Sequence, residues 1–136
     1  MPRKASQHPT ELELQILKIL WREGEMNVRR LRELLAEDSR DLAYTSVMTM
    51  TGIMTDKGYL KRRREGKGYV YRPAISEKGI SRDMMGDLVK RVFDGSARAA
   101  MVNLLEMGQI DEQEIEDLRR LLDERESRSE GKEQSS

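Results

Sequence analysis

The chain has 136 residues, of which 25 are basic and 25 acidic, and it contains no cysteine. This length suits one domain or two small ones, and the missing thiols exclude disulfides and cysteine-ligated metals. No apolar run reaches the length of a membrane span and the start MPRKASQHPTE lacks a signal-peptide core, so we expect a cytoplasmic protein without direct membrane association.

The neutral total conceals two oppositely charged halves. Residues 1–75 hold 15 basic and 10 acidic residues, a net charge of +5, whereas residues 76–136 hold 10 and 15, a net charge of −5. Such an asymmetry is typical of a nucleic-acid-binding module beside a module with another role, although helical proteins also show it for other reasons.

The first elements are predicted from their capping residues. Residues 1–9 are polar and basic, and we expect a disordered arm there. Thr10 and Glu13 fit a capping box at the start of a first helix, which ends near Gly24. Asn27 is placed to cap a second helix, and a polar stretch breaks the chain after it.

The most informative stretch follows. A third helix is predicted from about Ala43 to Lys57, then a basic strand LKRRR, a turn at Glu65–Gly68 and an aromatic strand YVYRP. This order of helix, basic strand, glycine-bearing turn and aromatic strand is typical of a winged helix-turn-helix. The side chains of the third helix expected to face inward are Val47, Met50 and Met54.

Charge and hydroxyl groups in this stretch suit DNA. Lys57 to Arg72 contains seven Lys or Arg residues and one acid, Glu65. Side chains alternate along a strand, so no more than half of a basic run can face one side. The outer surface of the third helix is almost uncharged, and its hydroxyls suit base edges or phosphates. Tyr69 and Tyr71 are expected to pack the wing onto that helix. The residues predicted to bind DNA are Tyr44, Thr45, Ser46, Met48, Thr49, Lys57, Arg62, Arg64 and Lys67.

Three short helices are predicted beyond the wing. We expect Ser81 to cap the first, Ser96 the second, and Asp111 with Glu114 the third. None could bury its apolar stripe alone, so two copies of the chain are expected to pack these helices together in a homodimer. The predicted interface residues are Leu88, Val92, Leu105, Ile115, Leu118 and Leu122.

The predicted fold class is mainly α with a small β-hairpin wing. An N-terminal winged helix-turn-helix is expected at 10–74 and a C-terminal three-helix dimerisation domain at 75–126, followed by a disordered tail at 127–136. No catalytic group is predicted, because the single histidine, His8, lies in the polar arm and cannot activate the Ser or Thr residues. No cofactor or metal site is predicted either.

Several motifs together resemble the penicillinase-repressor family, which comprises the dimeric winged-helix repressors of β-lactamase and methicillin-resistance operons. The similarity covers roughly Thr10 to Glu126. The matching segments are Thr10–Glu13, Ile19–Trp21, Ala43–Thr49, Lys57–Leu60, Tyr69–Pro73, Phe93–Ser96 and Met101–Glu106.

The resemblance implies a homodimer that occupies an inverted-repeat operator in double-stranded DNA and blocks transcription. It also implies release by proteolytic cleavage in the dimerisation domain, dependent on a membrane sensor-protease, with the bond between Asn103 and Leu104 aligned to the cleavage site. At Ile53 the family pattern commonly has Arg, and Thr51 and Gly52 replace its usual aliphatics, so the operator sequence is expected to differ. The cysteine cluster of the related copper-responsive repressors is absent, so copper sensing is not expected.

Two other readings remain open from the residues. One is a ligand-responsive winged-helix regulator with an effector pocket between its two modules. The other is a winged-helix protein–protein adaptor, against which the basic wing counts.

Overall fold

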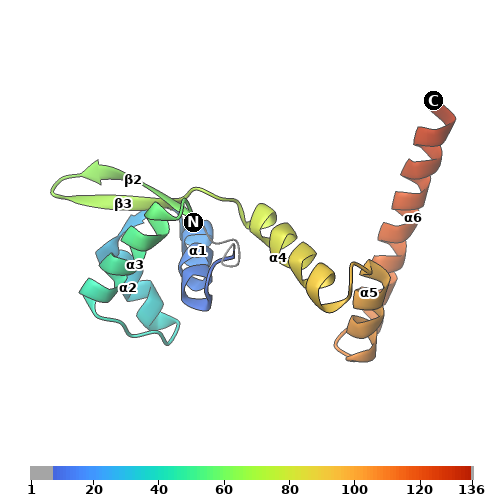
Figure 1. Ribbon diagram of the computed structural model, residues 1–136, viewed down its shortest axis with the longest axis horizontal. Coiled ribbons are helices and arrows are strands. Elements are labelled where there is room, and N and C mark those ends of the chain that lie inside the picture. Colours follow the sequence, from blue (N-terminus) through green and yellow to red (C-terminus); the bar gives the residue numbers. More distant parts are fainter. Residues whose placement is uncertain (1–7, 136) are drawn as a thin grey trace. The chain divides into compact units, whose positions relative to one another are not determined.

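The computed structural model describes residues 8–135, with side chains up to Gly131 (Figure 1). The chain divides into two compact units, of which the first extends to Gly86 and the second begins at Asp87. The predicted fold class is confirmed: the described residues are mainly helical and carry one small antiparallel sheet. Most of the arm predicted at 1–9 lies outside the described residues. The first unit contains α1 (Glu11–Glu23), β1 (Met26–Asn27), α2 (Val28–Glu37), α3 (Tyr44–Asp56), β2 (Leu60–Glu65), β3 (Gly68–Pro73) and the beginning of α4 (Glu77–Val92).

The predicted caps of the first two helices are confirmed. Thr10 Oγ1 accepts a hydrogen bond from the Glu13 amide at 3.2 Å, and Glu13 Oε1 accepts one from the Thr10 amide at 2.9 Å, which together form the capping box of α1. Gly24 ends this helix with a φ of 93°, a value that glycine adopts without steric cost. Asn27 Oδ1 accepts a hydrogen bond from the Arg30 amide at 2.9 Å and starts α2.

The sheet has three strands in the order β1-β3-β2 (Figure 1). β1 was not predicted, because a strand of two residues is too short to show an alternating pattern. It pairs antiparallel with β3, with Met26 opposite Tyr71, and so joins the wing to the beginning of α2. The hairpin turn consists of Gly66 and Lys67, and the positive φ of 64° at Gly66 accounts for the glycine there.

The core of the first unit forms where α1, α2 and α3 pack against the sheet (Figure 1). Val47 and Met54 of α3 are fully buried as predicted, and Met50 is partly buried. Thr51 is also fully buried, and its hydroxyl donates to the carbonyl of Met48 at 2.9 Å, so a polar side chain fits this apolar site without an unsatisfied donor.

The segment between β3 and α4 is hydrogen-bonded to α1. The indole Nε1 of Trp21 donates a hydrogen bond to the carbonyl of Ile75 at 3.0 Å. α4 then begins at Glu77 and is capped by Ser76, whose Oγ accepts from the Gly79 amide at 3.0 Å. The prediction of Ser81 as the cap is therefore wrong. The acidic Glu77 follows Ser76 in the first turn, where the positive end of the helix dipole stabilises a carboxylate. Ser81 lies inside the helix, where a capping side chain has no free amide to accept from.

The second unit contains the end of α4, α5 (Ala97–Glu106) and α6 (Glu112–Ser135). The predicted caps of α5 and α6 are confirmed. Ser96 Oγ accepts from the Ala99 amide at 3.0 Å, and Asp111 Oδ1 accepts from the Glu114 amide at 2.8 Å. α6 continues to Ser135, so the tail predicted as disordered at 127–136 is helical in the structure over most of its length. Its Glu, Arg, Lys and Gln residues favour a helix enough to tolerate Gly131.

None of the described residues from Asp87 to Gly131 is buried within the single chain. Over the described part of the chain, every helix is too short or too polar to span a membrane.

Candidate nucleic-acid interface

The outer surface of α3 carries no charged side chain from Tyr44 to Thr55. Thr45, Ser46 and Thr49 are exposed, and Tyr44 and Met48 each expose 44% of their surface. Ile53, on the same helix, is 40% exposed. A solvent-facing helix usually carries Lys and Glu on such a surface, so these hydroxyl and apolar groups form a surface suited to a groove of DNA.

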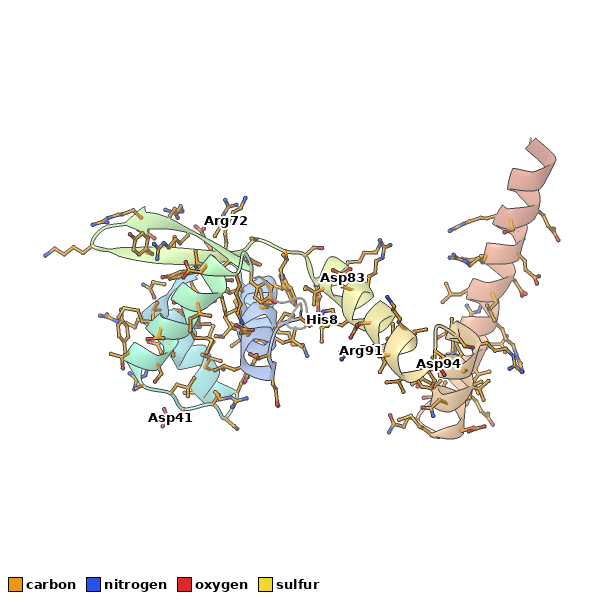
Figure 2. The ribbon with its side chains drawn as sticks, viewed as in Figure 1. His8, Asp41, Arg72, Asp83, Arg91 and Asp94 are labelled. Atoms are coloured by element: carbon orange, nitrogen blue, oxygen red, sulfur yellow. The ribbon has the colours of Figure 1, made fainter. Side chains whose placement is uncertain are left out.

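The hairpin register separates the basic residues of the wing into two faces. Arg62 lies opposite Tyr71, and Arg64 lies opposite Tyr69, whereas Arg63 lies opposite Val70. Because side chains alternate along each strand, Arg62 and Arg64 share a face with the two tyrosines. Lys61 and Arg63 belong to the other face, together with Arg72, which is labelled in Figure 2 near the end of β3.

Arg63 already has carboxylate partners. Its Nη2 lies 2.6 Å from Oε1 of Glu25 and 4.0 Å from Oε2 of Glu65. The hydrogen bond from Arg63 holds the pKa of the Glu25 carboxyl below its usual value. Among the basic residues of β2, Arg63 therefore forms an intramolecular ion pair, which links β2 to the loop before β1.

The two tyrosines of β3 have different surroundings. Tyr71 belongs to the buried core together with Val47 and Met54 of α3, as predicted. Tyr69 is partly buried against the same core and also lies beneath basic side chains of β2. The guanidinium carbon of Arg62 is 4.2 Å from the centroid of the Tyr69 ring, and that of Arg64 is 5.7 Å away.

A groove of about 520 Å³ lies between the wing and the starts of α2 and α3. It brings together Tyr44 and Met48 of α3 and Lys67 of the turn, three residues that the sequence predicts to bind DNA. Arg29 also lines the groove and was missed by the sequence prediction. The described part of the chain offers Arg29 no ion pair, in contrast to its neighbour Arg30, which pairs with Glu33 at 3.1 Å. Its position one residue after Val28, at the start of a helix, gives no local sign of its nearness to the wing.

Lys57 has an internal partner that the sequence prediction did not include. Its Nζ lies 2.8 Å from Oε2 of Glu13, whose side chain is only 2% exposed. Burial raises the pKa of the Glu13 carboxyl, but the hydrogen bonds from Lys57 and Thr10 together outweigh it and lower the pKa below its usual value. Lys57 thus joins the end of α3 to the start of α1, and its contact with DNA stays a prediction.

The residues predicted for the dimer interface are largely uncovered within one chain. Leu88, Leu118 and Leu122 are 45%, 44% and 60% exposed. Val92 and Leu105 are also exposed, and Ile115 is half-buried. Asn103 and Leu104, the predicted cleavage position, both lie exposed within α5.

The helices α2 and α3, followed by a β-hairpin with a basic face, define a winged helix-turn-helix. The chain belongs to the penicillinase-repressor family: residues 9–124 match the family described as "Penicillinase repressor". The resemblance seen in the sequence motifs is thereby confirmed.

Relatives match most of the chain. The penicillinase repressor of Bacillus licheniformis is 27% identical over 119 residues, which cover 88% of this chain and 92% of that protein. The transcriptional regulator BlaI of Mycobacterium tuberculosis is 33% identical over 119 residues, covering 86% and 84% of the two chains. The methicillin resistance regulatory protein MecI of Staphylococcus aureus is 21% identical over 110 residues, covering 81% and 89%.

Two solved structures are similar to parts of the chain. The solution structure of the DNA-binding domain of the repressor BlaI shares 28% identity with a TM-score of 0.47, and covers 56% of this chain and 90% of that one. The solution structure of monomeric Bacillus licheniformis BlaI in complex with the blaP half-operator shares 26% identity with a TM-score of 0.44, and covers 51% and 83%.

Proposed function

We propose that this protein is a dimeric transcriptional repressor that occupies an inverted-repeat DNA operator. The observation that carries the proposal is the uncharged outer surface of α3 beside cations of the wing that have no carboxylate partner among the described residues. Membership of a family whose relatives are named as repressors and regulators of transcription supports it.

In this proposal α3 lies in the major groove. Thr45, Ser46 and Thr49 donate to or accept from base edges, while Met48 makes apolar contact with a thymine methyl group. Arg62, Arg64 and Lys67 hold phosphates of the flanking backbone, which fixes the register of α3 without reading sequence. Arg29 and Tyr44, across the groove from Lys67, add a second contact with the backbone.

Dimerisation is proposed from the second unit. Between Asp87 and Gly131 the chain buries no residue by itself, although it carries apolar side chains along α4, α5 and α6. A free chain with this much apolar surface is unfavourable in water, and packing against a second copy removes it. A two-fold dimer presents two α3 helices at a fixed separation, which is the reason to expect an inverted repeat.

Release by proteolysis is proposed from the family resemblance, with a membrane sensor-protease as the partner. The bond proposed to be cleaved lies inside α5, a helix of ten residues, and a helix interior is a poor protease substrate, so cleavage requires local opening of α5 or a dedicated protease. Cleavage between Asn103 and Leu104 separates α6 from the DNA-binding unit. The two half-site contacts are then no longer tethered, and affinity falls by about 10²–10⁴-fold.

The proposal is tested by selecting sequences that the full chain binds from a library of genomic fragments. We expect two similar half-sites in inverted orientation, protected together from nuclease cleavage. Failure to bind any duplex at about 50 mM salt, where phosphate contacts are strong, would rule out the DNA-binding function and favour the adaptor.

A further inference from the structure

Two arginines of the wing are held in place without being neutralised. Arg62 and Arg64 form no ion pair with a carboxylate in the described part of the chain, yet both guanidinium groups lie over the ring of Tyr69. The distances of 4.2 and 5.7 Å fall within the range of cation–π attraction. Unlike a carboxylate, an aromatic ring does not neutralise the cation, so each guanidinium keeps its full charge and N–H groups that can donate to another acceptor.

Arg63, between them on the same strand, shows the opposite arrangement. It is held by Glu25 at 2.6 Å, and the carboxylate cancels its charge. The two ways of fixing an arginine thus alternate along β2 in step with the strand, with tyrosine on one face and carboxylate on the other.

The hairpin register explains how one ring serves two arginines. Tyr69 lies directly opposite Arg64, and its diagonal neighbour across the strands is Arg62. The diagonal contact is the shorter of the two. Tyr69 is itself fixed, because it packs against the core and its ring centroid lies 6.4 Å from that of buried Tyr71.

We propose that Tyr69 is a positioning residue for DNA binding: its ring orders the guanidinium groups of Arg62 and Arg64 as a pair of charged donors for two phosphates of one strand. The proposal rests on the proposed DNA-binding function. The affinity of the wing for the DNA backbone then depends on the fixed ring of Tyr69 as well as on the number of cations. Ordering the side chains before binding reduces the entropy that phosphate contact costs.

The experiment uses the full chain and a mixed-sequence 40-base-pair duplex as the probe, with affinity measured between about 50 and 200 mM salt. Three variants are compared: Tyr69→Phe keeps the ring, Tyr69→Leu removes it while remaining apolar, and Arg62→Ala/Arg64→Ala removes the cations. The double arginine variant is also combined with Tyr69→Leu. Side-chain NMR signals of Arg62 in the free protein report the ring contact without DNA.

We expect Tyr69→Leu to weaken binding about three- to tenfold and to remove the ring-current shift of the Arg62 signals, whereas Tyr69→Phe stays within about twofold of the parent protein. Adding Tyr69→Leu to the double arginine variant should change the affinity no further. An equal loss in that background would mean that Tyr69 supports the fold and does not act through the arginines, and an unchanged affinity of Tyr69→Leu would equally overturn the proposal. If the parent protein does not bind the duplex at all, the proposed function fails instead.

Discussion

Lys57 and Glu13, separated by 44 positions in the sequence, form an ion pair of 2.8 Å that joins the end of α3 to the start of α1. The other oxygen of the same carboxylate accepts a hydrogen bond from the amide of Thr10. One buried acid therefore both caps the first helix and holds the helix proposed to read DNA. The orientation of α3 depends on a residue that lies on a different helix and far from its outer surface.

Replacing Lys57 by Met should destabilise the first unit, because the buried carboxylate of Glu13 loses its partner. The expected loss at pH 7 is about 1–2 kcal/mol in the free energy of unfolding, less than for a fully buried pair because the Lys57 side chain is 37% exposed. Urea unfolding measures it, with Lys61→Met on the exposed wing as the control. Equal stability of the two variants would show that the pair contributes nothing.

The same pair predicts a pH dependence. The pKa of Glu13 in the folded chain lies below its usual 4.5, so the unfolded chain binds this proton more readily. The contribution of the pair is therefore present above pH 4.5 and is lost as the pH falls through the folded pKa. The difference in stability between the parent protein and Lys57→Met should narrow as the pH is lowered from 7 to about 3. A difference that stays constant over this range would contradict the assignment to Glu13.

Changing Arg62, Arg64 and Lys67 together to Ala should weaken binding to all DNA sequences. The slope of the logarithm of affinity against the logarithm of salt concentration should fall by up to about three. Arg63→Ala is the matched control from the same strand, and because its guanidinium is engaged by Glu25 it should change the slope little. If Arg63→Ala alone lowers the slope as much as Arg62→Ala or Arg64→Ala alone, the DNA does not contact the face of the wing that we propose.

Arg29 should prove to be a phosphate contact. Its replacement by Ala is expected to lower the salt slope by about one and to weaken specific and random DNA alike. Arg30→Ala on the next position is the control, since Arg30 pairs with Glu33. The prediction is wrong if Arg29→Ala binds with the same salt slope as the parent protein, or if Arg30→Ala lowers the slope by as much as Arg29→Ala does.

The contrast between these residues shows what the sequence could predict. Local signals sufficed for the caps at Thr10 and Asn27 and for the presence of the hairpin, because each depends on residues close in the chain. The partner of Lys57, the strand β1 and the nearness of Arg29 to the wing depend on how distant elements pack. The alternation along β2 predicted that no more than half of its cations face one side, but only the structure identifies Arg63 as the arginine paired with a carboxylate.

The second unit should form a dimer in solution. Replacing Leu118 and Leu122 of α6 by Lys places charges on apolar surface that we propose to be buried between two copies, and should give a monomer. Sedimentation at micromolar concentration measures the association, with Arg119→Lys/Arg120→Lys on the same helix as a control that keeps the charge. A parent protein that sediments as a monomer at this concentration would refute the dimer.

Cleavage between Asn103 and Leu104 is the final prediction, and it separates proteolytic release from release by a ligand. In the native host, a cell-wall antibiotic should convert the intact chain to two fragments as the regulated gene is induced, which mass spectrometry would detect. Leu104→Glu changes a half-exposed side chain at the proposed cleavage position and should leave the chain intact and the gene repressed. Gln109→Glu, outside α5, is the control with the same added charge, and should be cleaved normally. If the gene is induced while the parent chain stays whole, the proteolytic mechanism is wrong, and a ligand-responsive regulator becomes the better account of the same fold.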